Sequence, residues 1–145
     1  MVKVILGKAG SGKTKQVIDM VNTAVTEESG SVVCIENGQT LRLSIKHDVK
    51  LVDISEYGME LSYDHLYAFV CGLYCGNYDI THIFVDGLYK VTGDDDNAKA
   101  PAFLAKLEEL FDLAQRVVLY AQSDFPDLKV YICGLNLFKD KKETT

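Results

Sequence analysis

The fold is decided by the stretch VKVILGKAGSGKT, residues 2–14. It begins with a short apolar run at residues 2–6, which is typical of a buried β-strand. The run stops at a glycine-rich segment, and from Lys13 onward apolar residues recur at helical spacing. The stretch therefore predicts a strand, a glycine-rich turn and a helix in direct succession.

The glycine-rich segment matches the pattern GxxxxGK[ST] at every fixed position. A loop that surrounds a triphosphate must turn several backbone N–H groups inward, which requires conformations that glycine adopts most readily. The helix that follows adds its N-terminal amides and its dipole to the attraction. The Lys13 ammonium would reach the β- and γ-phosphates, and the Thr14 hydroxyl would bind Mg²⁺. The residues predicted to bind the nucleotide are Gly7, Lys8, Ala9, Gly10, Ser11, Gly12, Lys13 and Thr14.

In the rest of the chain, short β-branched runs alternate with longer amphipathic stretches, which is typical of an α/β fold with a mainly parallel sheet. Helices are expected around residues 66–73 and 101–114, and Pro101 suits the first turn of the second. The polar residues 37–48 fit a short helix and a loop equally well. Further strands are expected at residues 32–35, 50–54, 82–85, 117–120 and 130–133. We expect a three-layer α/β/α sandwich.

Length and charge limit the possible partners. A chain of 145 residues is expected to form one domain, residues 1–138, followed by a charged tail at residues 139–145. Fifteen basic residues against 21 acidic ones give a net charge of −6, which opposes nucleic-acid binding by the protein alone. No apolar stretch is long enough for a transmembrane helix, and the four cysteines lie in apolar runs. We therefore expect a cytoplasmic protein with reduced thiols and no membrane contact.

The strand, turn and helix at residues 2–14 resemble the P-loop nucleotide-binding superfamily, whose fold accounts for the whole succession of strands and helices. Members of this superfamily carry an apolar strand that ends in an aspartate, which holds Mg²⁺ through a water molecule. Asp86, after the apolar residues 83–85, resembles that aspartate. Asp53, after a shorter and less apolar run, is the alternative.

The catalytic base is harder to assign. ATPases of this superfamily that use a glutamate base often carry it directly after the strand aspartate, but Gly87 follows Asp86 here. Recombinase-like members carry the base at the end of the second strand, and Glu36 resembles that residue. Gln122 and Asp124 stand where related proteins have a γ-phosphate sensor. The resemblance leaves Glu36 and Asp124 as the candidates that would orient the attacking water.

Missing features narrow the choice of nucleotide and reaction. The chain has no NKxD sequence, the guanine-reading element of most GTPases, so ATP is the expected nucleotide. Its two arginines, Arg42 and Arg116, are fewer than nucleoside-monophosphate kinases use to neutralise phosphates. Each arginine is interpreted as a surface residue, because most charged side chains are solvated, and the alternative is that either acts as a finger toward a neighbouring subunit. The run at residues 94–96 is interpreted as a solvated acidic loop rather than a metal site.

Residues 117–125 resemble a strand and loop of thymidine kinases, although the Glu-Ala-Gln element, the zinc cysteines and the long C-terminal lasso of those enzymes are absent. The expected function is a slow Mg²⁺-dependent ATPase that needs a protein partner or a homo-oligomer for full activity. One alternative is a kinase for a nucleoside or another small acceptor. The other is a binding module that senses ATP without hydrolysing it.

Overall fold

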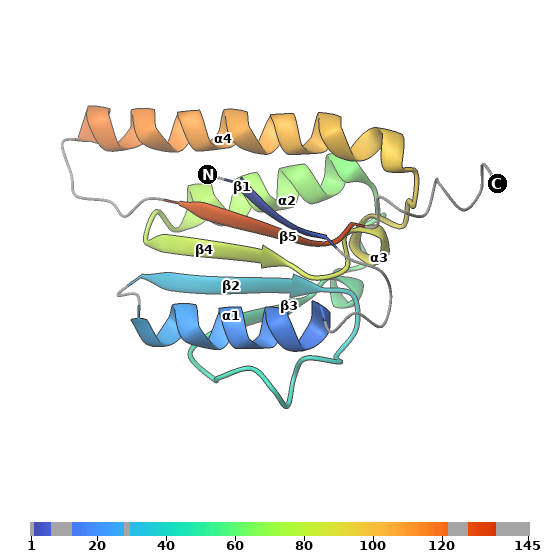
Figure 1. The fold of residues 1–145 in the computed structure, drawn as a ribbon. Helices are drawn as coiled ribbons and strands as arrows, with labels where there is room; N and C mark the ends of the chain where they lie inside the picture. Colours follow the sequence, from blue (N-terminus) through green and yellow to red (C-terminus); the bar gives the residue numbers. More distant parts are fainter. Residues whose placement is uncertain (1, 7–12, 28–29, 122–127, 136–145) are drawn as a thin grey trace.

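The computed structural model describes residues 2–6, 13–27, 30–121 and 128–135 (Figure 1). Within these residues, five parallel strands form one sheet in the order β1-β5-β4-β2-β3. The strands are β1 (Val2–Leu6), β2 (Ser31–Glu36), β3 (Lys50–Asp53), β4 (Ile80–Val85) and β5 (Lys129–Leu135). The helices are α1 (Lys13–Glu27), α2 (Tyr63–Gly76), α3 (Leu88–Thr92) and α4 (Ala100–Ala121), with short 3-10 helices η1 (Ile54–Tyr57) and η2 (Asn97–Lys99).

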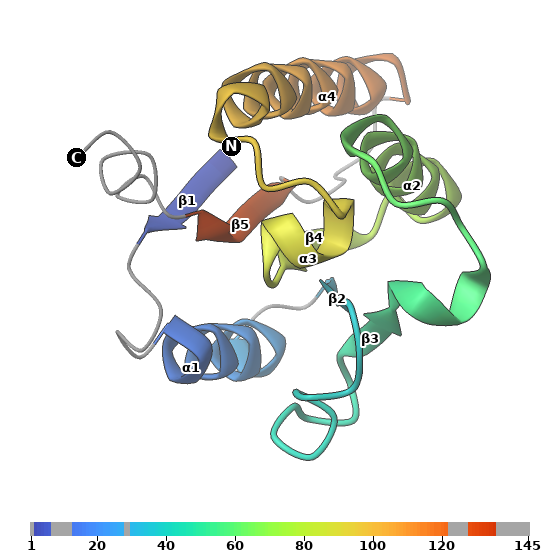
Figure 2. The ribbon, with the colours of Figure 1, turned by 90° about the vertical axis from the view of Figure 1, so that its right-hand side faces the viewer.

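The sheet is the middle one of three layers. Helix α1 lies on one face, and α2 and α4 lie on the other (Figures 1 and 2). The chain crosses the sheet from β1 to β2 through α1 and returns from β3 to β4 and β5 through α2 and α4. Because crossovers between parallel strands are right-handed, this reversal of direction puts the returning helices on the opposite face. The three-layer α/β/α sandwich expected from the sequence is confirmed.

Each face of the sheet has its own apolar core. All six residues of β4 are buried, as expected for a strand of a parallel sheet that is covered on both faces. On the face of α2 and α4, β4 contributes Ile83 and Val85 to the core. On the face of α1 it contributes Phe84, which packs in one cluster with Val17 and Val21 of the helix. The sheet residues therefore alternate between two separate cores.

The segment between β2 and β3 completes the layer of α1. Residues 37–49 form turns, so the loop interpretation is confirmed and the short helix is not formed. The buried side chains of this segment, Leu41, Ile45 and Val49, belong to the same core as α1. The Asn22 side chain of α1 holds the segment with two hydrogen bonds: its amide group donates to the Ser44 carbonyl oxygen, and its Oδ1 atom accepts from the Lys46 N–H, each at 2.9 Å.

Helix α4 is longer than the sequence predicted. The expected strand at residues 117–120 is wrong, since these residues continue α4 to Ala121. Apolar residues of the sequence keep a spacing of three or four residues through this region, at positions 103, 107, 110, 114, 117 and 121. The helical pattern therefore continues through the two valines at 117 and 118. Arg116 is therefore in a helix rather than at the start of a strand. Within the described ranges, no helix is long and apolar enough to cross a membrane.

Candidate functional site

The carboxyl ends of the parallel strands form one edge of the molecule, which faces the viewer in Figure 2. At this edge β1 ends at Leu6 and α1 begins at Lys13, so the GxxxxGK[ST] pattern connects a strand to a helix as predicted. Thr14, the second residue of α1, is exposed. Residues 7–12 lie outside the described residues, and for Lys13 only the backbone is described.

Strands β2 and β4 are neighbours in the sheet, and after each of them the chain continues toward a different edge of the sheet. From β2 the chain continues outward to β3, whereas from β4 it goes back toward β5. In open α/β sheets, such a switch point leaves a crevice outside the carboxyl ends of the two strands, where ligands bind. The Asp86 N–H donates to the Ile35 carbonyl oxygen at 2.9 Å, so the two strand ends stay joined up to this edge.

Asp86 lies at this switch point, directly after β4, and is half-buried. Asp53, the alternative metal ligand, lies at the end of the edge strand β3. Its Oδ1 atom accepts hydrogen bonds from the Gly38 N–H at 2.8 Å and from the N–H and hydroxyl groups of Ser55 at 3.0 and 2.6 Å. The Ser55 hydroxyl, followed by the Gly38 N–H, holds the pKa of the Asp53 carboxyl below its usual value. This carboxylate caps η1 and fixes the turn after β2, which is a structural role.

Glu36, the candidate base, ends β2 and is 2% exposed. Its Oε1 atom accepts from the Thr40 hydroxyl at 2.8 Å, and its Oε2 atom accepts from the Leu41 N–H at 3.3 Å. Both carboxylate oxygens thus hold the turn that follows the strand. A base that orients water must present an oxygen to the substrate, so these contacts favour a structural role for Glu36.

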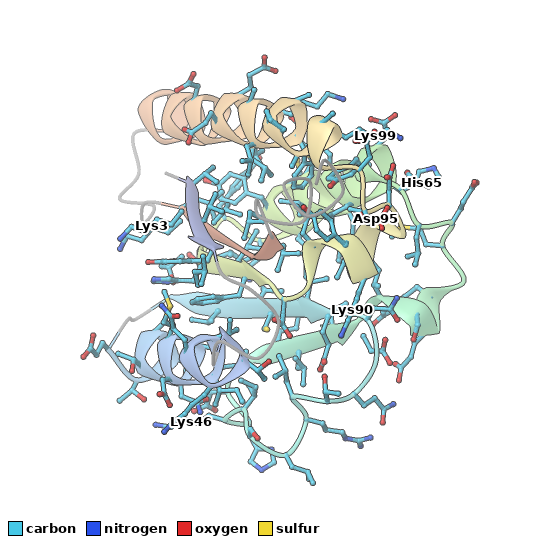
Figure 3. All side chains as sticks on the ribbon, turned by 45° about the vertical axis from the view of Figure 1, so that its right-hand side comes forward. Lys3, Lys46, His65, Lys90, Asp95 and Lys99 are labelled. Carbon is cyan, nitrogen blue, oxygen red and sulfur yellow. The ribbon has the colours of Figure 1, made fainter. Side chains whose placement is uncertain are left out.

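A hydrogen bond between two residues without a predicted role, Asn37 and Lys90, connects the segments that follow β2 and β4. The Asn37 amide group donates to the carbonyl oxygen of Lys90 in α3 at 2.8 Å. Lys90 is exposed and lies between α3 and the end of β2 in Figure 3. The signal in the sequence was a lysine four residues after the strand aspartate, one helical turn away.

A pocket of about 290 Å³ opens beside the switch point at the ends of β2 and β3. Arg42 donates to the Gln39 side-chain oxygen at 3.3 Å, and Gln39 donates to Glu56 at 3.2 Å, so a chain of polar groups crosses its wall. Arg42, one of the two arginines considered as a finger, is exposed and lines this pocket. The lining residues are Glu36, Gly38, Gln39, Arg42, Leu51, Asp53, Glu56 and Tyr57.

The sequence analysis also named residues 94–96, 122, 124 and 139–145. Gln122 and Asp124 fall outside the described residues, as does the tail at residues 139–145. The acidic run at residues 94–96 forms a loop, in which Asp94 pairs with Lys99 at 2.6 Å. That contact holds the pKa of the Asp94 carboxyl below its usual value. In the part of the chain that the structure describes, no three His, Cys, Asp or Glu side chains are grouped so that they could hold a metal ion.

No model of a known protein family matches this chain, and no curated protein is significantly similar to it. The functional argument therefore depends on the residues of the chain and on the geometry of the carboxyl edge.

Proposed function

We propose that the protein binds ATP with Mg²⁺ at the carboxyl edge of the sheet and hydrolyses it slowly, reaching its full rate with a protein partner or a second copy of the chain. The observation that carries this proposal is the position of the GxxxxGK[ST] pattern between β1 and α1, at the edge that also holds the β2/β4 switch point. A phosphate-binding loop needs this strand-to-helix context.

The donor groups at this edge fit the proposed ligands. Lys13 and the backbone amides of residues 7–12 would hold the phosphates, as the sequence pattern implies. The Thr14 hydroxyl and the Asp86 carboxylate offer the oxygen ligands that Mg²⁺ prefers in nucleotide sites. Mg²⁺ in such a site neutralises phosphate charge. Asp86 is favoured over Asp53 because it lies at the switch point, whereas Asp53 caps η1.

The hydrogen bonds of Glu36 support the expectation of a slow reaction. With both oxygens of Glu36 engaged in the turn, Asp124 is the favoured candidate for orienting water. P-loop enzymes that act without a stimulating partner turn over at about 10⁻⁴ to 10⁻² per second. Arg42, exposed at the carboxyl edge, is available to a neighbouring molecule. Stimulation by a partner or by self-association is therefore part of the proposal.

The proposal is tested by titrating wild type and Lys13→Ala with ATP and GTP in the presence of Mg²⁺ while ADP release is monitored. Wild type should bind ATP more tightly than GTP, and Lys13→Ala should lose most of this affinity. Lys15→Ala is the matched control, because Lys15 is exposed on the same helix and carries the same charge. Equal ATP binding by wild type and Lys13→Ala would overturn the proposal, and rapid turnover by a monomer would refute the need for a partner.

The pocket beside the switch point favours a kinase as the second candidate function. Its wall offers the hydrogen-bond donor Arg42, the acceptors Asp53 and Glu56, and the ring of Tyr57, which is 62% exposed. A small polar acceptor with an aromatic face would find complementary groups there. A screen of nucleosides and other small alcohols with labelled ATP tests this candidate. Transfer of phosphate to water alone would exclude it.

The third candidate is a module that binds ATP without hydrolysing it. The observation in its favour is that both carboxylate oxygens of Glu36 accept hydrogen bonds from the turn after β2. It predicts tight ATP binding, no ADP formation, and a change in association with a partner or a second copy when ATP is added. Sedimentation with and without ATP, alongside an ADP assay, separates it from the slow ATPase.

A further inference from the structure

The turn after β2 begins with Asn37 and Gly38, the only asparagine in the sequence that is followed by glycine. Gly38 has a φ of +111°, a conformation that glycine adopts and most other residues resist. The turn therefore requires glycine at position 38. Asparagine is a thermolabile residue, and a glycine after it has no side chain to hinder attack of its backbone nitrogen on the asparagine side chain.

The two groups that would react are held by different elements. The Asn37 Nδ2 atom donates to the Lys90 carbonyl oxygen of α3 at 2.8 Å. The Gly38 N–H donates to the Asp53 Oδ1 atom at the end of β3, also at 2.8 Å. Because β4, which leads into α3, and β3 flank β2 in the sheet, the two hydrogen bonds hold the turn from both sides.

Both acceptors are themselves fixed in place. The N–H groups of Lys90 and Val91 donate to the Gly87 carbonyl oxygen at 2.9 and 3.0 Å, so the first turn of α3 is folded onto the end of β4. The Oδ1 atom of Asp53 also accepts from the N–H and hydroxyl groups of Ser55. Hydrogen bonds to a carboxylate are stronger than those between neutral groups. The side-chain amide of residue 37 and the backbone nitrogen of residue 38 are therefore kept on separate partners.

We propose that Asn37 is a site of spontaneous deamidation that these two hydrogen bonds protect, and that it reacts when the turn opens. In the open turn, the Gly38 nitrogen gives its proton to a solvent base and forms a bond to the Asn37 Cγ atom. The bond between Cγ and Nδ2 breaks, and the nitrogen leaves as ammonia. Water then opens the cyclic imide at either carbonyl, which leaves aspartate or isoaspartate at position 37. The overall reaction consumes water, releases ammonia and needs no other reactant.

The product cannot restore the contact with α3. A carboxylate has no hydrogen to donate, so its oxygens would face the Lys90 carbonyl oxygen as two acceptors. The new negative charge would also lie directly after Glu36, which is 2% exposed, and in the turn that Asp53 already contacts. The reaction would thus convert a temporary opening of the turn into a permanent loss of the hydrogen bond that joins the segments after β2 and β4.

The protection is tested by incubating the full chain in native buffer and in denaturant, and by following each asparagine with peptide mapping and mass spectrometry. In denaturant, Asn37 should convert faster than Asn22 and Asn77, because threonine and tyrosine follow those residues. In native buffer, conversion of Asn37 should be at least tenfold slower than in denaturant. This comparison needs no variant, so it holds even if a substitution in the turn prevents folding.

Variants then assign the protection to its partners. Asp53→Ala removes the acceptor of the Gly38 N–H and should raise the native rate about tenfold, as expected for loss of one hydrogen bond to a charged group. Asp53→Asn keeps an acceptor oxygen and should react more slowly than Asp53→Ala. Lys90→Ala is the matched control, because it keeps the backbone carbonyl that Asn37 contacts, and it should react at the wild-type rate. A melting curve of each variant confirms that it is folded.

The consequence is tested with Asn37→Asp, which imitates one product, and with Asn37→Ala, which removes the hydrogen bond without adding charge. Asn37→Asp should speed hydrogen exchange at the Lys90 and Val91 amides at least tenfold, and by more than Asn37→Ala does. Equal conversion of Asn37 in native buffer and denaturant, or an unchanged or slower rate in folded Asp53→Ala, would overturn the protection. Exchange as slow as in wild type in Asn37→Asp would overturn the loss of the contact. None of these outcomes depends on nucleotide binding.

Discussion

The Thr40 hydroxyl donates a 2.8 Å hydrogen bond to the Oε1 atom of Glu36, so the carboxylate that ends β2 is held by the turn that follows it. The second oxygen of Glu36 accepts from the Leu41 N–H. This arrangement makes Glu36 part of the framework of the carboxyl edge. It also means that Glu36 and the turn at residues 37–41 stabilise each other.

The first prediction separates the structural role of Glu36 from a catalytic one. Glu36→Gln can keep both contacts, because its oxygen can accept from Leu41 while its amide donates to the Thr40 hydroxyl. We expect stability and ATP turnover close to wild type. Glu36→Ala should lower the free energy of unfolding by about 1–3 kcal/mol, since it leaves a buried N–H without an acceptor. A loss of turnover by a factor of about 10² to 10⁴ in Glu36→Gln, with stability unchanged, would instead identify the base.

The second prediction concerns the two hydrogen bonds that hold the segment at residues 37–49 on α1. Asn22→Ala removes both contacts, and we expect it to lower the free energy of unfolding by about 1–2 kcal/mol. The Lys46 amide should lose protection against hydrogen exchange. Thr23→Ala, at an exposed neighbouring position of α1, should leave that amide protected. Unchanged exchange at Lys46 in Asn22→Ala would contradict the role of Asn22.

The third prediction is that substitution by alanine changes the free energy of unfolding in opposite directions at two glycines. Gly72 lies inside α2, and an added Cβ atom would meet no other atom within 4 Å. Gly72→Ala should therefore raise the free energy of unfolding by about 0.5–1 kcal/mol. Gly87 has a φ of +76°, so Gly87→Ala should lower it by about 1–2 kcal/mol. Denaturant unfolding of both variants measures the difference, and stabilisation by both would show that the Gly87 turn can relax.

The fourth prediction concerns alkaline pH. Burial, with a smaller effect from Tyr89, raises the pKa of Tyr63 to about 12, above the usual value near 10. The folded state therefore favours the protonated hydroxyl. Its contribution to stability is complete below about pH 10 and is lost as the pH rises toward about 12, because the unfolded chain ionises first. Tyr63→Phe should reduce the loss of stability over this range, as followed by denaturant unfolding.

The control for this pH experiment is Tyr57→Phe, because Tyr57 is 62% exposed. It should leave the alkaline loss of stability as in wild type. The Tyr63 hydroxyl is buried and makes no well-formed hydrogen bond within the described residues. Tyr63→Phe should therefore not be destabilising at neutral pH, and a large loss there would refute this description of the site.

The sequence predicted the framework of the fold well where a local pattern determines the element. The strand expected at residues 82–85 lies in the buried strand β4, and the helix expected around residues 66–73 lies in α2. The error at residues 117–120 has a physical reason. A β-branched run at the end of an amphipathic stretch fits a strand and a last helical turn equally well, and tertiary packing decides between them.

The candidate site could be predicted only in part. Asp86 and the ends of β1 and α1 follow from a strand pattern and a motif, which are local in the sequence. The contact between Asn37 and Lys90 depends on strands β2 and β4 becoming neighbours, which no local pattern specifies. The hydrogen bonds of Glu36 likewise depend on the path of a turn that the sequence left undecided.

The pairing of β1 with β5 has a consequence for the way the chain folds during synthesis. Val2 of β1 pairs with Val130 of β5. Among the described strands, the backbone groups of β1 can therefore be paired only after β5 has been synthesised. Until then, β1 leaves the ribosome with an apolar sequence and unpaired edges, a state that is open to aggregation. Non-local parallel pairing of this kind also slows folding. The strand that leads into the proposed phosphate-binding loop is thus among the last parts of the sheet to be paired, and the proposed nucleotide site should form only after β5 has been synthesised.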